Sequence, residues 1–151
     1  MSRSLQMLAV SLLAGALAPL AFAAPNGGQT KAAASPKVVL AGSQFGRVLF
    51  DGNGRALYVF TRDPRGRSVC SGECAAKWPP YVVRGKVVAG PGVRASLIGT
   101  TRRRDGRIQV LYAGRPLYFY VGDPKGKVLC GNVTEFGGLW LVVAASGRPV
   151  K

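Results

Sequence analysis

The sequence predicts an all-β fold, in which duplicated antiparallel hairpin or meander units pack as one small pseudo-twofold sandwich or barrel-like domain. Residues 56–70, "ALYVFTRDPRGRSVC", return sixty positions later as "PLYFYVGDPKGKVLC" at residues 116–130, which indicates an internal duplication. Short segments rich in Val, Leu, Tyr and Phe alternate with Gly, Pro and Asp, as is typical of antiparallel strands. Only "GECAAKW", residues 72–78, has the composition of a helical turn, and Pro79 and Pro80 should end it.

The first residues predict an exported protein. An Arg near the start, an apolar run from Leu5 to Leu17 and a small-x-small end at residues 21–23 are typical of a secretory signal peptide over residues 1–23. Residues 24–42 are rich in Ala, Gly and Pro and are expected to form a flexible tether. No later stretch has the length of apolar sequence that a membrane span needs. We therefore expect a periplasmic or extracellular protein without a transmembrane segment after signal cleavage.

The folded domain is expected at residues 43–148, with copies of the repeat at about 44–83 and 106–145. Three hairpins are predicted, over residues 48–60, 97–112 and 110–120. The second turns near Asp105 and Gly106, and the third has a two-residue loop in which Gly114 adopts a positive φ. Apolar residues fall on both faces of residues 57–61, so this strand should be covered on both sides. The alternating aromatic residues Tyr58, Phe60, Tyr118 and Tyr120 either pack in the core or form a platform for a ligand.

Each copy contains the sequence Asp-Pro-x-Gly, beginning at Asp63 and Asp123. This pattern favours a β-turn with Asp at its first position, Pro at its second and Gly at its fourth. The carboxylate of each Asp is then expected to accept backbone N–H bonds of the turn. A pair of catalytic carboxylates is the alternative, if the pseudo-twofold axis brings the two turns together.

Two Tyr-x4-Asp units, Tyr58 to Asp63 and Tyr118 to Asp123, occur together with "CSGECAAKWPP" around Trp78 and "EFGGLWLVV" around Trp140. In this combination the chain resembles the bacterial family of secreted repeats of unknown function over about residues 44–148. The resemblance implies export, an all-β duplicated domain and tandem Tyr-x4-Asp motifs, and it assigns no activity. Many members are predicted lipoproteins, but this chain has no Cys directly after its apolar run.

Three cysteines, Cys70, Cys74 and Cys130, enter a compartment that permits disulfides. A Cys70–Cys74 bond would close a small ring worth about 2 kcal/mol in loop entropy. Because Cys130 occupies the repeat position of Cys70, a bond between Cys130 and either of the others is the alternative. A redox-active dithiol is disfavoured, since Cys-x3-Cys is not the Cys-x-x-Cys of thioredoxin-like sites.

The chain contains no His and only 6 Asp and Glu residues. The absence of His removes His-based general-base catalysis, His-ligated haem and imidazole zinc sites, and three cysteines are too few for a four-Cys metal site. We therefore expect no cofactor, no metal and no enzymatic activity. A Cys-based redox enzyme or a carboxylate-based hydrolase is the less favoured alternative.

Basic residues dominate the charge. Removal of Arg3 with the signal peptide changes the formal charge from +15 to +14. Most of the clustered cations fall in three expected turns: Arg62, Arg65, Arg67, Arg102, Arg103, Arg104, Arg107, Lys125 and Lys127. Because turns are exposed, we expect these side chains to bind anionic polymers: glycans, cell-wall or lipid phosphates, or extracellular nucleic acid. The alternative is a structural or assembly protein of the envelope, whose basic residues only keep it in solution.

Overall fold

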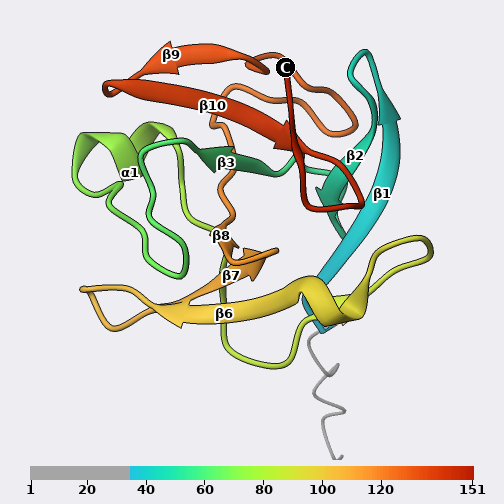
Figure 1. Cartoon of the computed structure of the whole chain (residues 1–151), viewed down its shortest axis with the longest axis horizontal. Coiled ribbons are helices and arrows are strands. Elements are labelled where there is room, and N and C mark those ends of the chain that lie inside the picture. The colour runs from blue at the N-terminus through green and yellow to red at the C-terminus, as the bar shows by residue number, and fades with distance from the viewer. Residues whose placement is uncertain (1–34) are drawn as a thin grey trace, which may run out of the picture. The chain divides into compact units, whose positions relative to one another are not determined.

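The computed structural model describes residues 35–151, so the expected signal peptide and most of the expected tether lie outside the described residues. Within them the prediction of an all-β fold is confirmed: short strands form three sheets, which stay open and do not close into a barrel. In Figure 1 strands β9, β10 and β3 lie together on one side, β6 and β7 lie on the opposite side, and β1 and β2 lie along a third.

The first sheet contains β1 (Lys37–Ser43), β2 (Gly46–Asp51) and β5 (Val88–Ala89). β1 and β2 form an antiparallel hairpin, whereas β5 adds to β1 as a parallel strand. Strand β1 begins at Lys37, six residues before the predicted boundary between tether and domain at residue 43. Val38 is fully buried in the core, and an apolar run this short beside an Ala- and Gly-rich segment did not stand out in the sequence.

The second sheet joins the two copies of the repeat. Strand β3 (Tyr58–Phe60) of the first copy pairs antiparallel with β10 (Gly138–Val143) of the second. Strands β9 (Val133–Glu135) and β11 (Pro149–Val150) also pair with β10. Since β11 extends to residue 150, ordered structure also continues beyond the expected domain end at 148.

The third sheet contains β4 (Val82–Val83), β6 (Ile98–Arg102), β7 (Ile108–Tyr112) and β8 (Arg115–Pro116). Strands β6 and β7 form the hairpin predicted to turn near Asp105. Strands β7 and β8 form the predicted hairpin with a two-residue loop, in which Ala113 and Gly114 have φ values of 50° and 72°. A 3-10 turn, η1 (Ala95–Leu97), leads into β6.

The predicted helical turn is α1 (Glu73–Lys77). It ends where the Trp78 backbone N–H donates to the Cys74 carbonyl at 2.7 Å. Pro79 and Pro80 follow directly and have no N–H with which to continue the helix.

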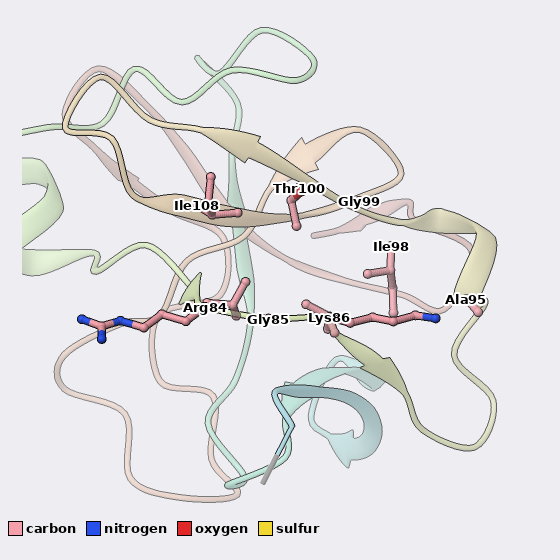
Figure 2. A pocket seen from close by; sticks show the side chains of 10 residues that line it. Arg84, Gly85, Lys86, Ala95, Ile98, Gly99, Thr100 and Ile108 are labelled. Carbon is pink, nitrogen blue, oxygen red and sulfur yellow. The ribbon is translucent and has the colours of Figure 1, made fainter. Parts of the chain in front are cut away.

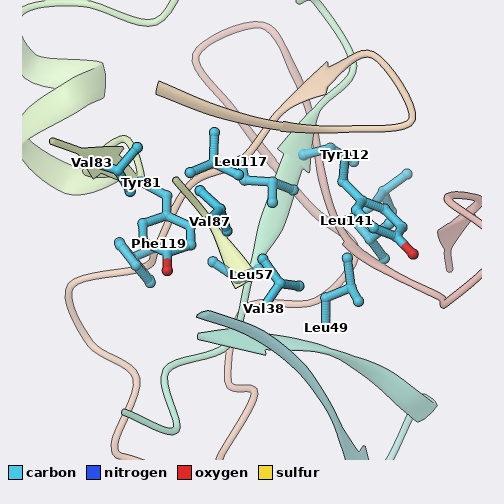
Figure 3. Close-up of a cluster of buried hydrophobic side chains, with 13 residues drawn as sticks. Val38, Leu49, Leu57, Tyr81, Val83, Val87, Tyr112, Leu117, Phe119 and Leu141 are labelled. Atoms are coloured by element: carbon cyan, nitrogen blue, oxygen red, sulfur yellow. The ribbon is translucent and has the colours of Figure 1, made fainter. Parts of the chain in front are cut away.

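Two hydrophobic cores lie on opposite faces of the central strands. The first core receives side chains from all three sheets (Figure 3) and comprises Val38, Leu49, Leu57, Val59, Tyr81, Val83, Val87, Val110, Tyr112, Leu117, Phe119, Leu141 and Val143. The second core comprises Val48, Phe50, Ala56, Tyr58, Phe60, Cys70, Cys74, Trp78, Tyr118, Val128, Trp140 and Val142. Residues 57–60 alternate between the two cores, which confirms that this strand is covered on both sides. Tyr58, Phe60 and Tyr118 therefore pack in the interior, and Tyr120 is half-buried beside them.

The two copies exchange backbone hydrogen bonds in a reciprocal pattern. Tyr58 and Tyr118 each donate an N–H to the other's carbonyl at 2.9 Å. The Gly66 N–H donates to Gly114 O at 2.8 Å, and the equivalent Gly126 N–H donates to Gly54 O at 2.7 Å. Each Asp-Pro-x-Gly turn thus rests on the hairpin loop of the other copy, as expected for a pseudo-twofold arrangement.

Candidate functional site

The Tyr and Asp residues of the repeated motif meet across the two copies. The Tyr58 hydroxyl donates to Asp123 Oδ2 at 2.5 Å, and the Tyr118 hydroxyl donates to Asp63 Oδ2 at 2.6 Å. Each Tyr therefore binds the Asp of the other copy and not the Asp five residues further along its own. Sequence spacing alone did not reveal this exchange.

The second oxygen of each carboxylate is bound locally, as the turn interpretation expects. The Val69 N–H donates to Asp63 Oδ1 at 2.8 Å, and the Leu129 N–H donates to Asp123 Oδ1 at 2.9 Å. The turn itself begins one residue later than predicted, because the Arg67 N–H donates to the Pro64 carbonyl at 3.2 Å. Gly66 then occupies the third position with φ 75°, where a type II turn requires a positive φ.

Burial raises the pKa of Asp63 and of Asp123, while the hydrogen bond from the partner tyrosine acts in the opposite direction. Burial also raises the pKa of Tyr58 and of Tyr118, and the facing carboxylates add to this effect. The phenols consequently stay protonated and act as donors. Since every oxygen of the two carboxylates accepts a hydrogen bond within the fold, this geometry favours a structural role over a catalytic pair.

A stack of four aromatic rings runs through the second core. The Trp78 and Trp140 rings lie parallel, with centroids 4.1 Å apart, Phe60 stacks on Trp140 at 4.2 Å, and Tyr120 lies against Trp78 at 4.8 Å. The motif tyrosines meet the stack edge-on, Tyr58 at Trp78 and Tyr118 at Trp140.

The two tryptophans differ in their polar contacts. Trp78 Nε1 donates to Glu135 Oε2 at 2.9 Å, and the same carboxylate pairs with Lys77 at 2.5 Å. Trp140 Nε1 is buried and has no hydrogen-bond partner among the described residues. The stack was missed in the sequence because Trp78 and Trp140 are displaced by two positions when the copies are aligned.

Cys70 and Cys74 form a disulfide with a Cα–Cα separation of 5.3 Å, so the favoured pairing is found and the pairings with Cys130 are not. Cys130 has a free thiol that is half-buried at the edge of the second core. The Cys130 side chain raises the pKa of the Tyr120 hydroxyl.

Arg103 is buried, contrary to the expectation that all clustered cations are exposed. Only 8% of this residue is exposed, and its guanidinium donates to Ser68 Oγ, Gln109 Oε1 and the Cys70 carbonyl, each at 2.7 Å. It therefore holds the first turn against the β6–β7 hairpin and is removed from the candidate polyanion-binding residues. Along β6 and its continuation, residues 101 and 103 share the inward face, whereas Arg102 and Arg104 point to solvent.

The first turn and the β6–β7 hairpin together form a basic hollow of about 200 Å³, lined by Arg67, Ser68, Val69, Cys70, Ser71, Arg103, Arg104 and Asp105. Thr101 Oγ1 donates to the Gly66 carbonyl at 2.6 Å, which helps to hold the turn beside the hairpin. The structure thus brings Arg67 and Arg104 together at one site, and both side chains are exposed.

The remaining predicted cations are placed elsewhere. Lys125 and Lys127 lie on the second turn, which contacts the hairpin loop at Gly54. Arg62 donates to the Phe136 carbonyl and Arg65 donates to the Ala113 carbonyl. Two further cations are engaged on the β6–β7 hairpin itself: Arg102 donates to Gly106 O, and Arg107 pairs with Asp105, whose pKa it lowers. Of the predicted cations, only Arg67, Arg103 and Arg104 line the basic hollow.

Residues 35–151 hold no cluster of three or more His, Cys, Asp and Glu side chains placed to bind a metal ion. No helix in this part of the chain is long and apolar enough to cross a membrane.

The pattern of a family described as "Secreted repeat of unknown function" matches the chain twice, at residues 40–81 and 99–144. The first match contains Tyr58 and Asp63, and the second contains Tyr118 and Asp123, so each match carries one set of the exchanged hydrogen-bonding groups. Neither the curated proteins nor the solved structures contain a significant match to this chain.

Proposed function

Because the chain belongs to the family of secreted repeats of unknown function, we propose that it is an exported, non-enzymatic module that binds anionic polymers through the basic hollow. Its place of action is then the periplasm or the extracellular medium. Glycans, cell-wall or lipid phosphates and extracellular nucleic acid share the repeated negative charge that such a surface binds.

The observation that carries this proposal is the shortage of acidic partners for the exposed cations. Without Arg3 and Lys31, which precede the described residues, the formal charge falls from +15 to +13. Ion pairs in residues 35–151 involve only Lys77, Arg103 and Arg107. The exposed cations outside these pairs are Lys37, Arg47, Arg62, Arg65, Arg67, Arg84, Lys86, Arg94, Arg102, Arg104, Lys125, Lys127, Arg148 and Lys151.

Half of the six carboxylates are already engaged inside the fold and cannot form ion pairs with this surface. Asp63 and Asp123 accept bonds from tyrosines and the backbone, and Asp51 accepts backbone N–H bonds from Asn53 and Arg55. A surface with many cations and few free carboxylates attracts polyanions and releases their counterions on binding.

The basic hollow is the favoured contact because a rigid scaffold supports it. Arg103 and the Cys70–Cys74 disulfide hold the first turn in place, so Arg67 and Arg104 flank a fixed concavity. Ser68 and Ser71 add hydroxyl groups to its lining, which suit the oxygen atoms of phosphates and sulfates.

The test is titration of single-stranded DNA and heparin at several salt concentrations. On single-stranded DNA the slope of log affinity against log salt falls by about 0.7 for each lost phosphate contact. The variant Arg67→Ser/Arg104→Ser should therefore flatten the slope by about 1.4. Lys125→Ser/Lys127→Ser is the matched control, because it removes the same charge from the other turn, and it should change the slope by less than half as much.

The proposal fails if no binding is found at low salt. Equal slopes for the two double variants would also overturn it, because the basic residues would then act only through net charge.

An assembly role in the envelope is the second candidate. It is supported by Val121 and Leu129, which lie on either side of the second turn with 57% and 60% of their surfaces exposed. Large apolar side chains this exposed are typical of surfaces that contact a partner. Concentration-dependent association of the isolated chain, abolished by Val121→Ser/Leu129→Ser, would favour this role over polyanion binding.

A further inference from the structure

A second hollow, which we name the apolar pocket, lies between the third sheet and the segment that follows β4. It has a volume of about 550 Å³, and its lining includes the aliphatic side chains of Val83, Val87, Ile98 and Ile108 together with Arg84 and Lys86. A volume of this size falls within the range of small-molecule sites. None of its residues belongs to the basic hollow.

The pocket exists because the first core is incompletely covered at this point. Val83 and Val87 are members of the first core, and Ile98 and Ile108 pack against it while remaining half-exposed. Between Val83 and Val87 the chain leaves the third sheet and crosses to β5 in the first sheet. Gly85 lies at the middle of this crossing, and a Cβ there would meet no atom within 4 Å.

The polar groups at the pocket are cationic and hydroxylic. Arg84 and Lys86 are exposed, neither has an ion-pair partner among the described residues, and no carboxylate lines the pocket. Figure 2 shows the two side chains extending in opposite directions from Gly85, with Lys86 running toward Ile98 and Ala95. Thr100 adds a hydroxyl group on the β6 side.

We propose that the apolar pocket binds a small amphiphile whose apolar body, an alkyl chain or an aromatic ring system, carries one anionic head group. The four aliphatic side chains bury the body, and burial of apolar surface supplies the driving force. The head group, a carboxylate or an oxygen anion of similar size, is held by Lys86 or Arg84 through charge-assisted hydrogen bonds. This site is independent of the polyanion-binding function proposed above.

Direct binding is measured with decanoate by isothermal titration calorimetry, and by displacement of the fluorescent probe 1-anilinonaphthalene-8-sulfonate. Decanoate should bind at one site, whereas decanol should bind at least tenfold more weakly and decyltrimethylammonium should not bind. Equal affinities for decanoate and decanol would overturn the role of the cations. Equal affinities for decanoate and decyltrimethylammonium would reduce the pocket to a nonspecific apolar surface.

Two pairs of variants locate the site. Ala95→Trp places an indole at the pocket wall and should abolish decanoate binding, whereas Ser96→Trp, at the neighbouring exposed residue outside the lining, should leave it unchanged. Arg84→Gln/Lys86→Gln should weaken decanoate binding about tenfold, and Lys125→Gln/Lys127→Gln, with the same loss of charge, should weaken it less than twofold.

Near-ultraviolet circular dichroism checks that each variant stays folded. Binding that survives Ala95→Trp, or that falls equally in both charge variants, places the ligand elsewhere and overturns the proposal. Heparin binding serves as the independent readout: Ala95→Trp should leave it unchanged, so failure of one proposal is distinguishable from failure of the other.

Discussion

Replacement of Tyr118 by Phe tests whether the exchanged Tyr–Asp hydrogen bonds stabilise the fold. The variant removes the donor to Asp63, a carboxylate that is only 9% exposed, so water cannot readily replace the lost bond. Hydrogen bonds to charged groups contribute about 1.5–3 kcal/mol, and a buried acceptor left without a donor costs a similar amount. We expect the free energy of unfolding to fall by about 2–3 kcal/mol.

Two matched variants set the scale. Tyr58→Phe should cost about 1–2 kcal/mol, because its partner Asp123 is half-exposed and regains water. Tyr81→Phe should cost about 1 kcal/mol, because the buried Tyr81 hydroxyl donates only to an uncharged carbonyl, that of Lys37, at 3.1 Å. Urea unfolding followed by tryptophan fluorescence measures all three, with the m-value unchanged.

A double-mutant cycle then distinguishes exchange between copies from bonding within one copy. Tyr118→Phe and Asp63→Asn should couple by at least about 1 kcal/mol, whereas Tyr118→Phe and Asp123→Asn, which share no hydrogen bond, should be additive within about 0.5 kcal/mol. Coupling of Tyr118 to Asp123 in place of Asp63, or a cost of Tyr118→Phe no larger than that of Tyr81→Phe, would refute the reasoning.

Three further outcomes are expected. Arg103→Ser should lower the free energy of unfolding by about 2–4 kcal/mol, because it leaves buried acceptors without a donor. Arg104 is exposed, so Arg104→Ser should change this free energy by less than about 0.5 kcal/mol. Equal urea midpoints for the two variants would contradict this prediction. Non-reducing mass spectrometry should find one disulfide and one free thiol, and a disulfide to Cys130 would contradict the pairing. The variant Cys70→Ser/Cys74→Ser should lower the free energy of unfolding by about 2 kcal/mol through loop entropy. Burial raises the pKa of Asp63 above its unfolded value of about 3.9. Between the unfolded and the folded pKa the folded state therefore holds more protons, and stability falls as pH rises through that window. The difference in unfolding free energy between the parent and Asp63→Asn should follow this trend from pH 3 to 7, and a pH-independent difference would exclude it.

The sequence predicts best those features that depend on neighbours along the chain. The hairpins around Gly114 and Asp105 follow from turn chemistry, and the helical turn follows from its composition and the prolines after it. The local bonds of Asp63 and Asp123 to backbone N–H groups belong to the same class. The start of the first strand was missed because Val38 is buried by partners on β2 and in the other sheets, which local composition does not reveal.

Contacts between distant segments could not be predicted in the same way. The spacing from Tyr58 to Asp63 is compatible with bonding within one copy or across both, and only the docking of the two copies decides between them. Arg103 stands in a run of three arginines, where composition predicts exposure of all three. The one available signal was strand alternation carried through the turn, which places Thr101 and Arg103 together on the face opposite Arg102.

Neither half of this molecule is self-sufficient. A polypeptide holding only the first copy would bury the Tyr58 hydroxyl and the Asp63 carboxylate without their hydrogen-bond partners from the second copy. Trp78 would also lack Trp140, its neighbour in the stack. The smallest stable unit is therefore a pair of copies, supplied either by one chain or by two. The two halves, expressed as separate polypeptides, should complement each other, and chains built from this repeat should carry an even number of copies or use the odd one to recruit a second chain.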